Sequence, residues 1–139
     1  MRVFLDANVP FSAAYRETGS VRVFFSLADT GACQLVSSAY ALEEARRNIR
    51  VKHPERSSDL ESLLGRIALC PEPAAATLAW AATHRLPPKD APILAAAVDA
   101  RCHLLVTGDR THFGALFGRR LRRTVVMLPV DAIDLLVGR

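Results

Sequence analysis

Residues 3–8 read VFLDAN: three apolar residues, then an aspartate, an alanine and an asparagine. A short apolar run without polar alternation is typical of a strand that is buried on both faces of a sheet. Residues 104–109, LLVTGD, repeat the arrangement, because a second apolar run there ends in an aspartate. We expect these runs to be strands of one parallel sheet, with Asp6 and Asp109 at their carboxyl ends.

Three more apolar runs, at residues 34–36, 67–70 and 124–128, bring the predicted strands to five. Helical patterns separate them, at residues 10–15, 21–30, 39–52, from 57 onward, 73–84, 90–101, 111–117 and 130–137. Strands that alternate with helices predict an α/β fold with right-handed crossovers. We therefore expect a three-layer sandwich, in which helices flank a central parallel sheet of about five strands. A chain of 139 residues fits one domain, residues 1–139.

The composition indicates in which compartment of the cell the protein is found. Half of the residues are hydrophobic, yet no apolar run approaches the roughly 20 residues that span a bilayer. The chain starts directly with a strand-like segment, without a basic and then apolar leader. Its three cysteines form no CxxC pair and predict neither a zinc site nor a disulfide framework. These features predict a cytoplasmic protein that has no contact with a membrane.

The charge is positive overall, with 18 Lys and Arg against 14 Asp and Glu and a net charge of +4. Sixteen of the 18 basic residues are arginine, which favours bidentate contacts with phosphate. A basic surface attracts nucleic acid. The densest basic run comprises Arg119, Arg120, Arg122 and Arg123. It is a candidate for contact with an RNA backbone, although a solvated loop would have the same composition.

Four acids share a relation to the predicted strands and helices. Asp6 and Asp109 end strands, Asp90 precedes an alanine-rich helix, and Glu44 lies on the helix that follows residues 34–36. Because the carboxyl ends of parallel strands meet at one edge of a sheet, we expect a single acidic pocket. Such a pocket favours a divalent metal and phosphate chemistry. Taken singly, the three aspartates are equally compatible with capping of the helices that follow them.

Glu43 and Glu44 compete for the second acidic position. Glu43 has arginines three and four residues further on, where solvated ion pairs form. Glu44 lies nearer the edge of the apolar stripe, so the helical pattern favours it for the pocket. Asn8 stands two residues after Asp6, and Thr107 stands two residues before Asp109, so that the side chains of Thr107 and Asp109 share one face if the strand continues.

The ordered motifs resemble those of PIN domains, the compact nucleases found among the VapC-like toxins of type II toxin–antitoxin systems. The resemblance covers residues 3–109, through the motifs at 3–8, 35–44, 90–97 and 104–109, and residues 124–128 fit the closing strand. It implies a PIN fold and cleavage of single-stranded RNA that depends on Mg²⁺ or Mn²⁺. It also implies a small antitoxin as partner and a homodimer.

Carried onto this chain, the resemblance implies a catalytic set of Asp6, Glu44, Asp90 and Asp109. We expect Asp6, Asp90 and Asp109 to hold the metal and Glu44 to orient the attacking water, while Asn8 and Thr107 support the site by hydrogen bonds. Water as the nucleophile would not need the ribose hydroxyl, so DNA is not excluded on chemical grounds.

Two other functions remain open at this point. A phosphohydrolase of the haloacid-dehalogenase kind would use Asp6 as a covalent nucleophile, but it would place an acid where this chain has Asn8. A PIN fold can also bind RNA or a protein without cutting. Among further candidates, His112 is expected to face solvent rather than a scissile phosphate, Trp80 to anchor the core, and Asp99 to be solvated or to cap a helix.

Overall fold

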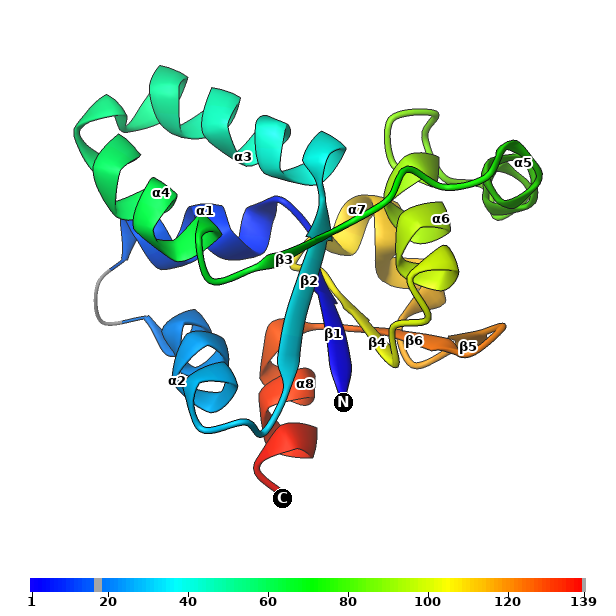
Figure 1. Cartoon of the computed structure of the whole chain (residues 1–139). Coiled ribbons are helices and arrows are strands. Elements are labelled where there is room, and N and C mark those ends of the chain that lie inside the picture. The colour runs from blue at the N-terminus through cyan, green and yellow to red at the C-terminus, as the bar shows by residue number, and fades with distance from the viewer. Residues whose placement is uncertain (17–18, 139) are drawn as a thin grey trace.

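The computed structural model describes residues 1–16 and 19–138, in which the central sheet has six strands in the order β3-β2-β1-β4-β6-β5 (Figure 1). The strands are β1 (Arg2–Leu5), β2 (Gln34–Ser38), β3 (Ala68–Cys70), β4 (Leu104–Val106), β5 (Arg120–Leu121) and β6 (Thr124–Met127). Five of them run parallel, and only β5 is antiparallel to its neighbour β6. The predicted α/β sandwich with a mainly parallel sheet is confirmed.

The sixth strand differs from the prediction. β5 falls inside the basic run and pairs with β6 through Leu121 opposite Thr124. Arg122 begins the tight turn between them with a φ of 56°, a left-handed backbone conformation that residues other than glycine rarely adopt. A strand of two residues leaves no periodic signal, so the sequence pattern suggested a loop there instead.

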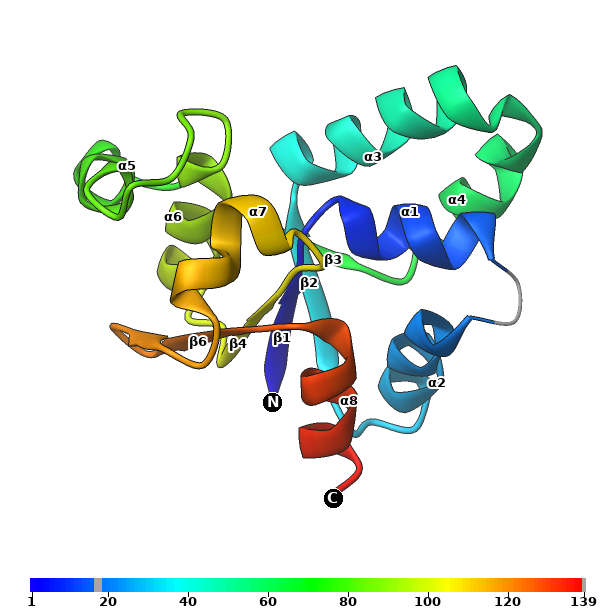
Figure 2. The same cartoon turned by 180° about the vertical axis from the view of Figure 1, so that it is seen from behind.

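Helices cover both faces of the sheet (Figures 1 and 2). They are α1 (Asn8–Tyr15), α2 (Val23–Asp29), α3 (Ala39–Lys52), α4 (Ser57–Leu64), α5 (Ala75–Ala82), α6 (Ala91–Asp99), α7 (Arg110–Phe113) and α8 (Pro129–Leu136). Short 3₁₀ turns lie at Ser20–Arg22, Pro54–Arg56 and Gly114–Leu116. The helix expected over residues 21–30 is thus a 3₁₀ turn followed by the shorter α2.

Alternation along β1 divides the core into two layers. Val3 and Leu5 point to one face and pack with α1, α2, α3, α4 and α8. Phe4 points to the other face and packs with α5, α6 and α7. All three side chains are fully buried, which explains why the first strand reads as an unbroken apolar run.

Two helix caps connect local sequence to the architecture. The Ser38 Oγ accepts a hydrogen bond from the Ala41 amide at 3.1 Å and so caps the start of α3. Asp99, at the end of α6, accepts hydrogen bonds from the Ala74 amide and the Thr77 hydroxyl, both at 2.7 Å. Asp99 therefore caps the start of the neighbouring helix α5, in agreement with the capping role that the sequence suggested.

The strand order creates a switch point beside β1. From β1 the chain moves to β2 and β3 on one side of the sheet, and it later adds β4, β6 and β5 on the other. Crossovers therefore diverge between the carboxyl ends of β1 and β4, where ligands bind in open parallel sheets. Asp6 and Thr107 follow β1 and β4 at this point.

Within residues 1–16 and 19–138, no helix is both long enough and apolar enough to cross a membrane.

The two-sided burial of the central strands can be tested with a matched pair of leucines. Leu105 lies on β4 and is fully buried, whereas Leu69 lies on the edge strand β3 and is 64% exposed. We expect Leu105→Ala to lower the free energy of unfolding by about 3 kcal/mol and Leu69→Ala by less than about 0.5 kcal/mol. Urea unfolding followed by circular dichroism measures both, and equal effects would contradict the assigned layers.

Candidate metal centre

Asp6 is the most enclosed acid of the site. It directly follows β1 and is only 4% exposed. Its Oδ1 accepts a hydrogen bond from the Ala7 amide at 2.7 Å, and its Oδ2 accepts one from the Thr107 hydroxyl at 2.8 Å. The Asn8 amide nitrogen donates to the same Oδ2 at 3.2 Å. Both carboxylate oxygens are thus held in place by the ends of β1 and β4.

Asn8 and Thr107 extend this network across the switch point. The Asn8 amide nitrogen also donates to the Thr107 Oγ1 at 3.2 Å, and the Asn8 Oδ1 accepts from the Gly108 amide at 2.8 Å. The Thr107 Oγ1 in turn accepts from the Asp109 amide at 3.1 Å. The two residues therefore link Asp6 to the backbone that carries Asp109.

Burial and neighbouring acids act on the charge of Asp6. Burial is the main cause that raises the pKa of Asp6 from 3.8 to about 6, and the carboxylates of Glu44 and Asp90 add to it. The hydrogen bonds from Thr107 and Ala7 oppose the rise. An ionised Asp6 is consequently costly unless a cation lies close to it.

The structure separates the two adjacent glutamates of α3. Glu43 is exposed and pairs with Arg50 at 3.2 Å and with Arg46 at 3.9 Å, so it belongs to the charged outer face. Glu44 is half-buried, and its charge raises the pKa of both Asp6 and Tyr40. The structure therefore brings Glu44, and not Glu43, to the acidic pocket.

Asp90 reaches the pocket through a loop that is tied to α3. The Tyr40 hydroxyl donates a hydrogen bond to the Lys89 carbonyl at 2.7 Å, which joins the first turn of α3 to the residue before Asp90. Asp90 is 6% exposed and precedes α6, but its side chain makes no capping hydrogen bond to that helix. Burial raises the pKa of Asp90 and the charge of Asp109 adds to the rise, whereas His112 and Lys89 lower it. Capping therefore does not account for this acid.

Asp109 uses its two oxygens differently. Oδ1 accepts a hydrogen bond from the His112 amide at 3.0 Å and so caps the short helix α7. Oδ2 lies 2.9 Å from the His112 Nδ1, and that same nitrogen lies 2.9 Å from the Asp90 Oδ2. The expectation that His112 faces solvent was wrong, because the capped turn directs its ring between two acids.

The donor atoms of this cluster fit a divalent cation. Asp90, Asp109 and His112 each offer one ligand atom, and the three atoms lie within 4.8 Å of one another. Among the described side chains, the buried polar atoms without a hydrogen bond are the Asp90 Oδ2 and the His112 Nδ1. The two atoms lie 2.9 Å from each other, and a cation bound by both would give each of them a further partner. The carboxylate oxygens suit Mg²⁺ or Mn²⁺.

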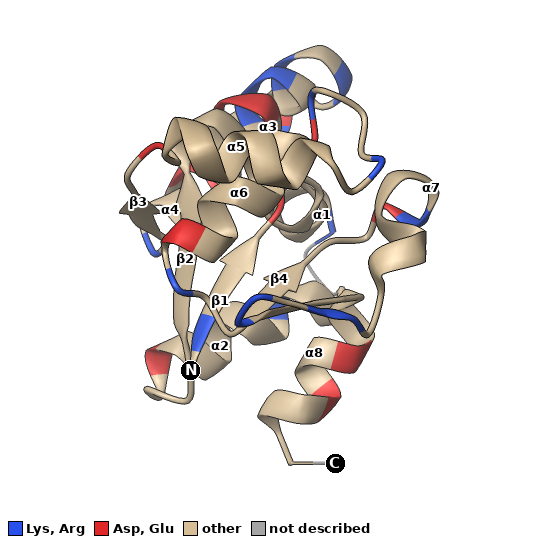
Figure 3. Cartoon of the chain, turned by 90° about the vertical axis from the view of Figure 1, so that its right-hand side faces the viewer, with Lys and Arg blue, Asp and Glu red and all other residues tan. Residues whose placement is uncertain are grey.

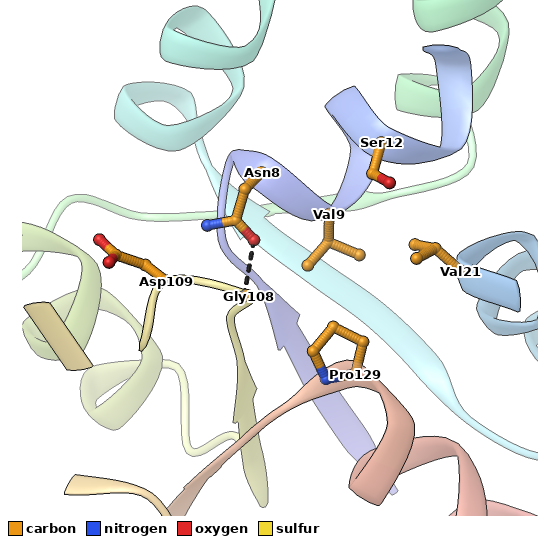
Figure 4. Close-up of a pocket in the computed structure, with 7 residues that line it drawn as sticks. All are labelled: Asn8, Val9, Ser12, Val21, Gly108, Asp109 and Pro129. Atoms are coloured by element: carbon orange, nitrogen blue, oxygen red, sulfur yellow. Dashed lines mark hydrogen bonds between the residues drawn. The ribbon is translucent and has the colours of Figure 1, made fainter. Parts of the chain in front are cut away.

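An open groove of about 420 Å³ borders this cluster. Its walls are formed by Asn8, Val9, Ser12, Val21, Gly108, Asp109 and Pro129 (Figure 4). Figure 4 shows the carboxylate of Asp109 turned away from Val9 and Pro129, with the hydrogen bond between Asn8 and Gly108 in between. The groove therefore lies beside the acidic cluster rather than inside it.

The basic run lies elsewhere on the molecule. Arg119, Arg120, Arg122 and Arg123 are all exposed, in and around β5, where Figure 3 shows basic residues along the hairpin. Arg122 and Arg123 connect β5 to the amino end of β6, which is the edge of the sheet opposite Asp6. The Arg122 guanidinium lies 4.1 Å from the centroid of the half-buried Trp80 ring. The structure thus does not bring these arginines to the acids.

The raised pKa of Asp6 leads to a stability prediction. Between pH 4 and 7 the unfolded chain releases the Asp6 proton earlier than the folded chain, so folded wild type loses stability as the pH rises. The shift from 3.8 to about 6 corresponds to about 3 kcal/mol at most. We expect Asp6→Asn to remove this loss, so that its stability relative to wild type increases from pH 4 to pH 7.

Urea unfolding of both proteins across this pH range, in chelator, measures the difference. Saturating Mn²⁺ should reverse most of the loss in wild type, because a bound cation offsets the charge of the ionised acid. Parallel stability curves for the two proteins would contradict the unfavourable burial of Asp6.

Solved structures with similar folds include VapBC2 from Rickettsia felis bound to a DNA fragment from its promoter, with a TM-score of 0.68, 17% identity, and coverage of 92% of this chain and 98% of that chain. FitAcB from Neisseria gonorrhoeae matches with a TM-score of 0.59, 23% identity and the same coverage. FitAB bound to an IR36 DNA fragment matches with a TM-score of 0.55, 26% identity, and coverage of 91% and 94%.

Sequence comparison gives the family. No curated protein sequence matches the chain at a significant level. The family model described as PIN domain matches residues 2–111, which contain all four acids and His112's partners Asp90 and Asp109. With this match over most of its length, and with a fold shared with VapBC and FitAB structures, the chain belongs to the PIN-domain family.

Proposed function

We propose that the protein is a metal-dependent endoribonuclease, the toxin component of a toxin–antitoxin module. One observation carries the proposal: Asp6, Asp90 and Asp109 gather with Glu44 at the switch point of a PIN fold, and the Asp90 Oδ2 is buried there without a hydrogen bond. PIN domains are a nuclease family, which supports phosphodiester hydrolysis as the reaction.

The acids have separate roles in this proposal. Asp6, Asp90 and Asp109 hold Mg²⁺ or Mn²⁺, which when bound lowers the pKa of water and offsets negative charge on a phosphoryl oxygen. Glu44 orients the attacking water, because it is half-buried beside the other acids and is engaged in no ion pair of the described residues. Asn8 and Thr107 keep the Asp6 carboxylate in one orientation through the hydrogen bonds that they donate.

The groove beside Asp109 suits a single-stranded substrate. Val21 and Pro129, both half-buried, provide apolar walls on which a base can pack, and Asn8 and Ser12 provide polar groups. A base inside a duplex would not be available for such a contact. The net charge of +4 favours approach of the polyanion.

The arginines of the β5–β6 hairpin are proposed to bind RNA at a distance from the acidic site. We propose that Arg119, Arg120 and Arg123 contact backbone phosphates several nucleotides from the scissile bond, since the hairpin turn lies at the opposite edge of the sheet. Arg122 belongs to the same basic surface, but its guanidinium also packs on Trp80.

The similar structures support a protein partner. They are VapBC and FitAB assemblies, so we propose that a small antitoxin binds this chain, that the chain forms a homodimer, and that both act in the cytoplasm, where RNA is found.

The adjacent glutamates provide a matched test of the active site. We expect Glu44→Gln to reduce cleavage of single-stranded RNA by at least about 100-fold and Glu43→Gln by less than about 2-fold, because only Glu44 faces the acidic pocket. Purified wild type should cleave in Mg²⁺ or Mn²⁺ and stop in excess chelator.

Four outcomes would contradict the proposal in different ways. Cleavage that persists in chelator would exclude a metal-dependent reaction, and equal losses in both glutamate variants would exclude the assigned role of Glu44. RNA that binds equally well without metal and remains intact would indicate a binding protein. A phosphoryl group trapped on Asp6 would indicate a covalent phosphohydrolase, although both Asp6 oxygens already accept hydrogen bonds.

The hairpin arginines can be tested by salt dependence. We expect the combined change of Arg119, Arg120 and Arg123 to glutamine to weaken RNA binding and to reduce the slope of log affinity against log salt by about 2 for single-stranded RNA. Cleavage at saturating RNA should change little. Fluorescence anisotropy at several salt concentrations measures the slope, and an unchanged slope would exclude this surface from RNA binding.

A further inference from the structure

His112 is the one member of the ligand cluster that is not a carboxylate. Its backbone is fixed by the hydrogen bond from its amide to the Asp109 Oδ1, which holds the first turn of α7. Its ring nitrogen Nδ1 lies 2.9 Å from one oxygen of Asp109 and 2.9 Å from one oxygen of Asp90. Asp109 thus directs the ring toward the space between Asp109 and Asp90. The same Asp109 would hold a cation together with His112.

The short contacts between the His112 ring and the two acids do not have the geometry of hydrogen bonds. The His112 Nδ1 makes no hydrogen bond despite its two short distances, and the Asp90 Oδ2, on a residue only 6% exposed, makes none either. A neutral imidazole with its proton on Nε2 turns the Nδ1 lone pair toward both carboxylates, which repel it, whereas a proton on Nδ1 would be donated to one of them. A cation bound by the three atoms removes the repulsion in the first case and gives each atom a partner.

We propose that the His112 Nδ1 is a direct ligand of the cation held by Asp90 and Asp109, and that it makes the site favour first-row transition ions over Mg²⁺. The inference rests on the proposed function only in requiring that the acidic centre binds a cation. Imidazole nitrogen binds transition ions well, whereas Mg²⁺ prefers oxygen ligands and retains several of its waters. A nitrogen ligand in an otherwise carboxylate site therefore changes the order of metal affinity.

A protonated His112 is the competing account. In that case the imidazolium itself would neutralise Asp90 and Asp109, and a divalent cation would have to displace it. The two accounts give opposite results when the ring is removed: loss of a ligand weakens binding of transition ions, whereas loss of a competing cation strengthens binding of every divalent ion.

The test is calorimetric titration of the full chain with Co²⁺, Mn²⁺ and Mg²⁺ separately. We expect His112→Ala to weaken Co²⁺ binding by about 10- to 100-fold, Mn²⁺ binding by less, and Mg²⁺ binding by less than about 3-fold. His112→Asn, which offers an oxygen in place of the ring nitrogen, should retain Mg²⁺ binding and lose the preference for Co²⁺. The visible spectrum of bound Co²⁺ should change in both variants.

His84→Ala is the matched control, since His84 lies against Trp80 and outside the cluster. It should bind all three ions as wild type does, and far-ultraviolet circular dichroism should show that every variant is folded. Tighter binding of all ions in His112→Ala would overturn the inference in favour of the imidazolium account. Equal weakening of Co²⁺ and Mg²⁺, or no change, would also overturn it.

The same titration separates this inference from the proposed function. If wild type binds no divalent ion, both are wrong. If wild type binds ions and cleaves RNA, and His112→Ala does both with unchanged metal preference, only the role of His112 is wrong.

Discussion

The hydrogen bond from the Thr107 hydroxyl to the Asp6 carboxylate joins the two strands on either side of the switch point. It is buried, it spans a separation of 101 residues along the chain, and the Asn8 amide bridges the same two groups. The strand order diverges here, and the carboxyl ends of strands at such a switch point are where ligands bind in open parallel sheets. The hydrogen bond between Thr107 and Asp6 fixes the relative position of these two strand ends. Glu44, Asp90 and Asp109 lie around them.

Placing several acids around such an opening has an electrostatic cost. Burial and mutual repulsion raise the pKa of Asp6 and of Asp90, so the ionised cluster is destabilised when it has no counter-charge. The surrounding protein offsets part of this cost at Asp90, because the charges of His112 and Lys89 lower the pKa of that carboxyl. A site that is held open and under-neutralised favours a cation strongly, and this is the physical basis of the function proposed for this PIN domain.

The sequence predicted the parts of the site that depend on regular structure. Asp6 directly follows an unbroken apolar run, and Asp109 comes three residues after the end of another, so both were predicted near strand ends. Glu44 was separated from Glu43 by helical spacing alone, and the ion pairs of Glu43 agree with that separation. Asp90 was harder, because its position before a helix equally fits a cap, and only the structure shows that its side chain caps nothing.

Contacts between distant segments were not predictable in this way. His112 stands three residues after Asp109, which is consistent with a capped turn, but the approach of its ring to Asp90 depends on how α6 and α7 pack. The bond from Tyr40 to the loop before Asp90 and the stacking of Arg122 on Trp80 have no local signal for the same reason. The short strand β5 was not predicted, because its pairing with β6, rather than its own composition, makes it a strand.

The central claim is that a divalent cation binds where these acids converge. Crystals grown without metal and soaked in Mn²⁺ allow the most direct measurement, an anomalous difference map at the manganese edge. The account predicts a peak within ligand distance of the carboxylates of Asp90 and Asp109. Ordered side chains with no peak there, or with peaks only at surface acids such as Glu43, would contradict it.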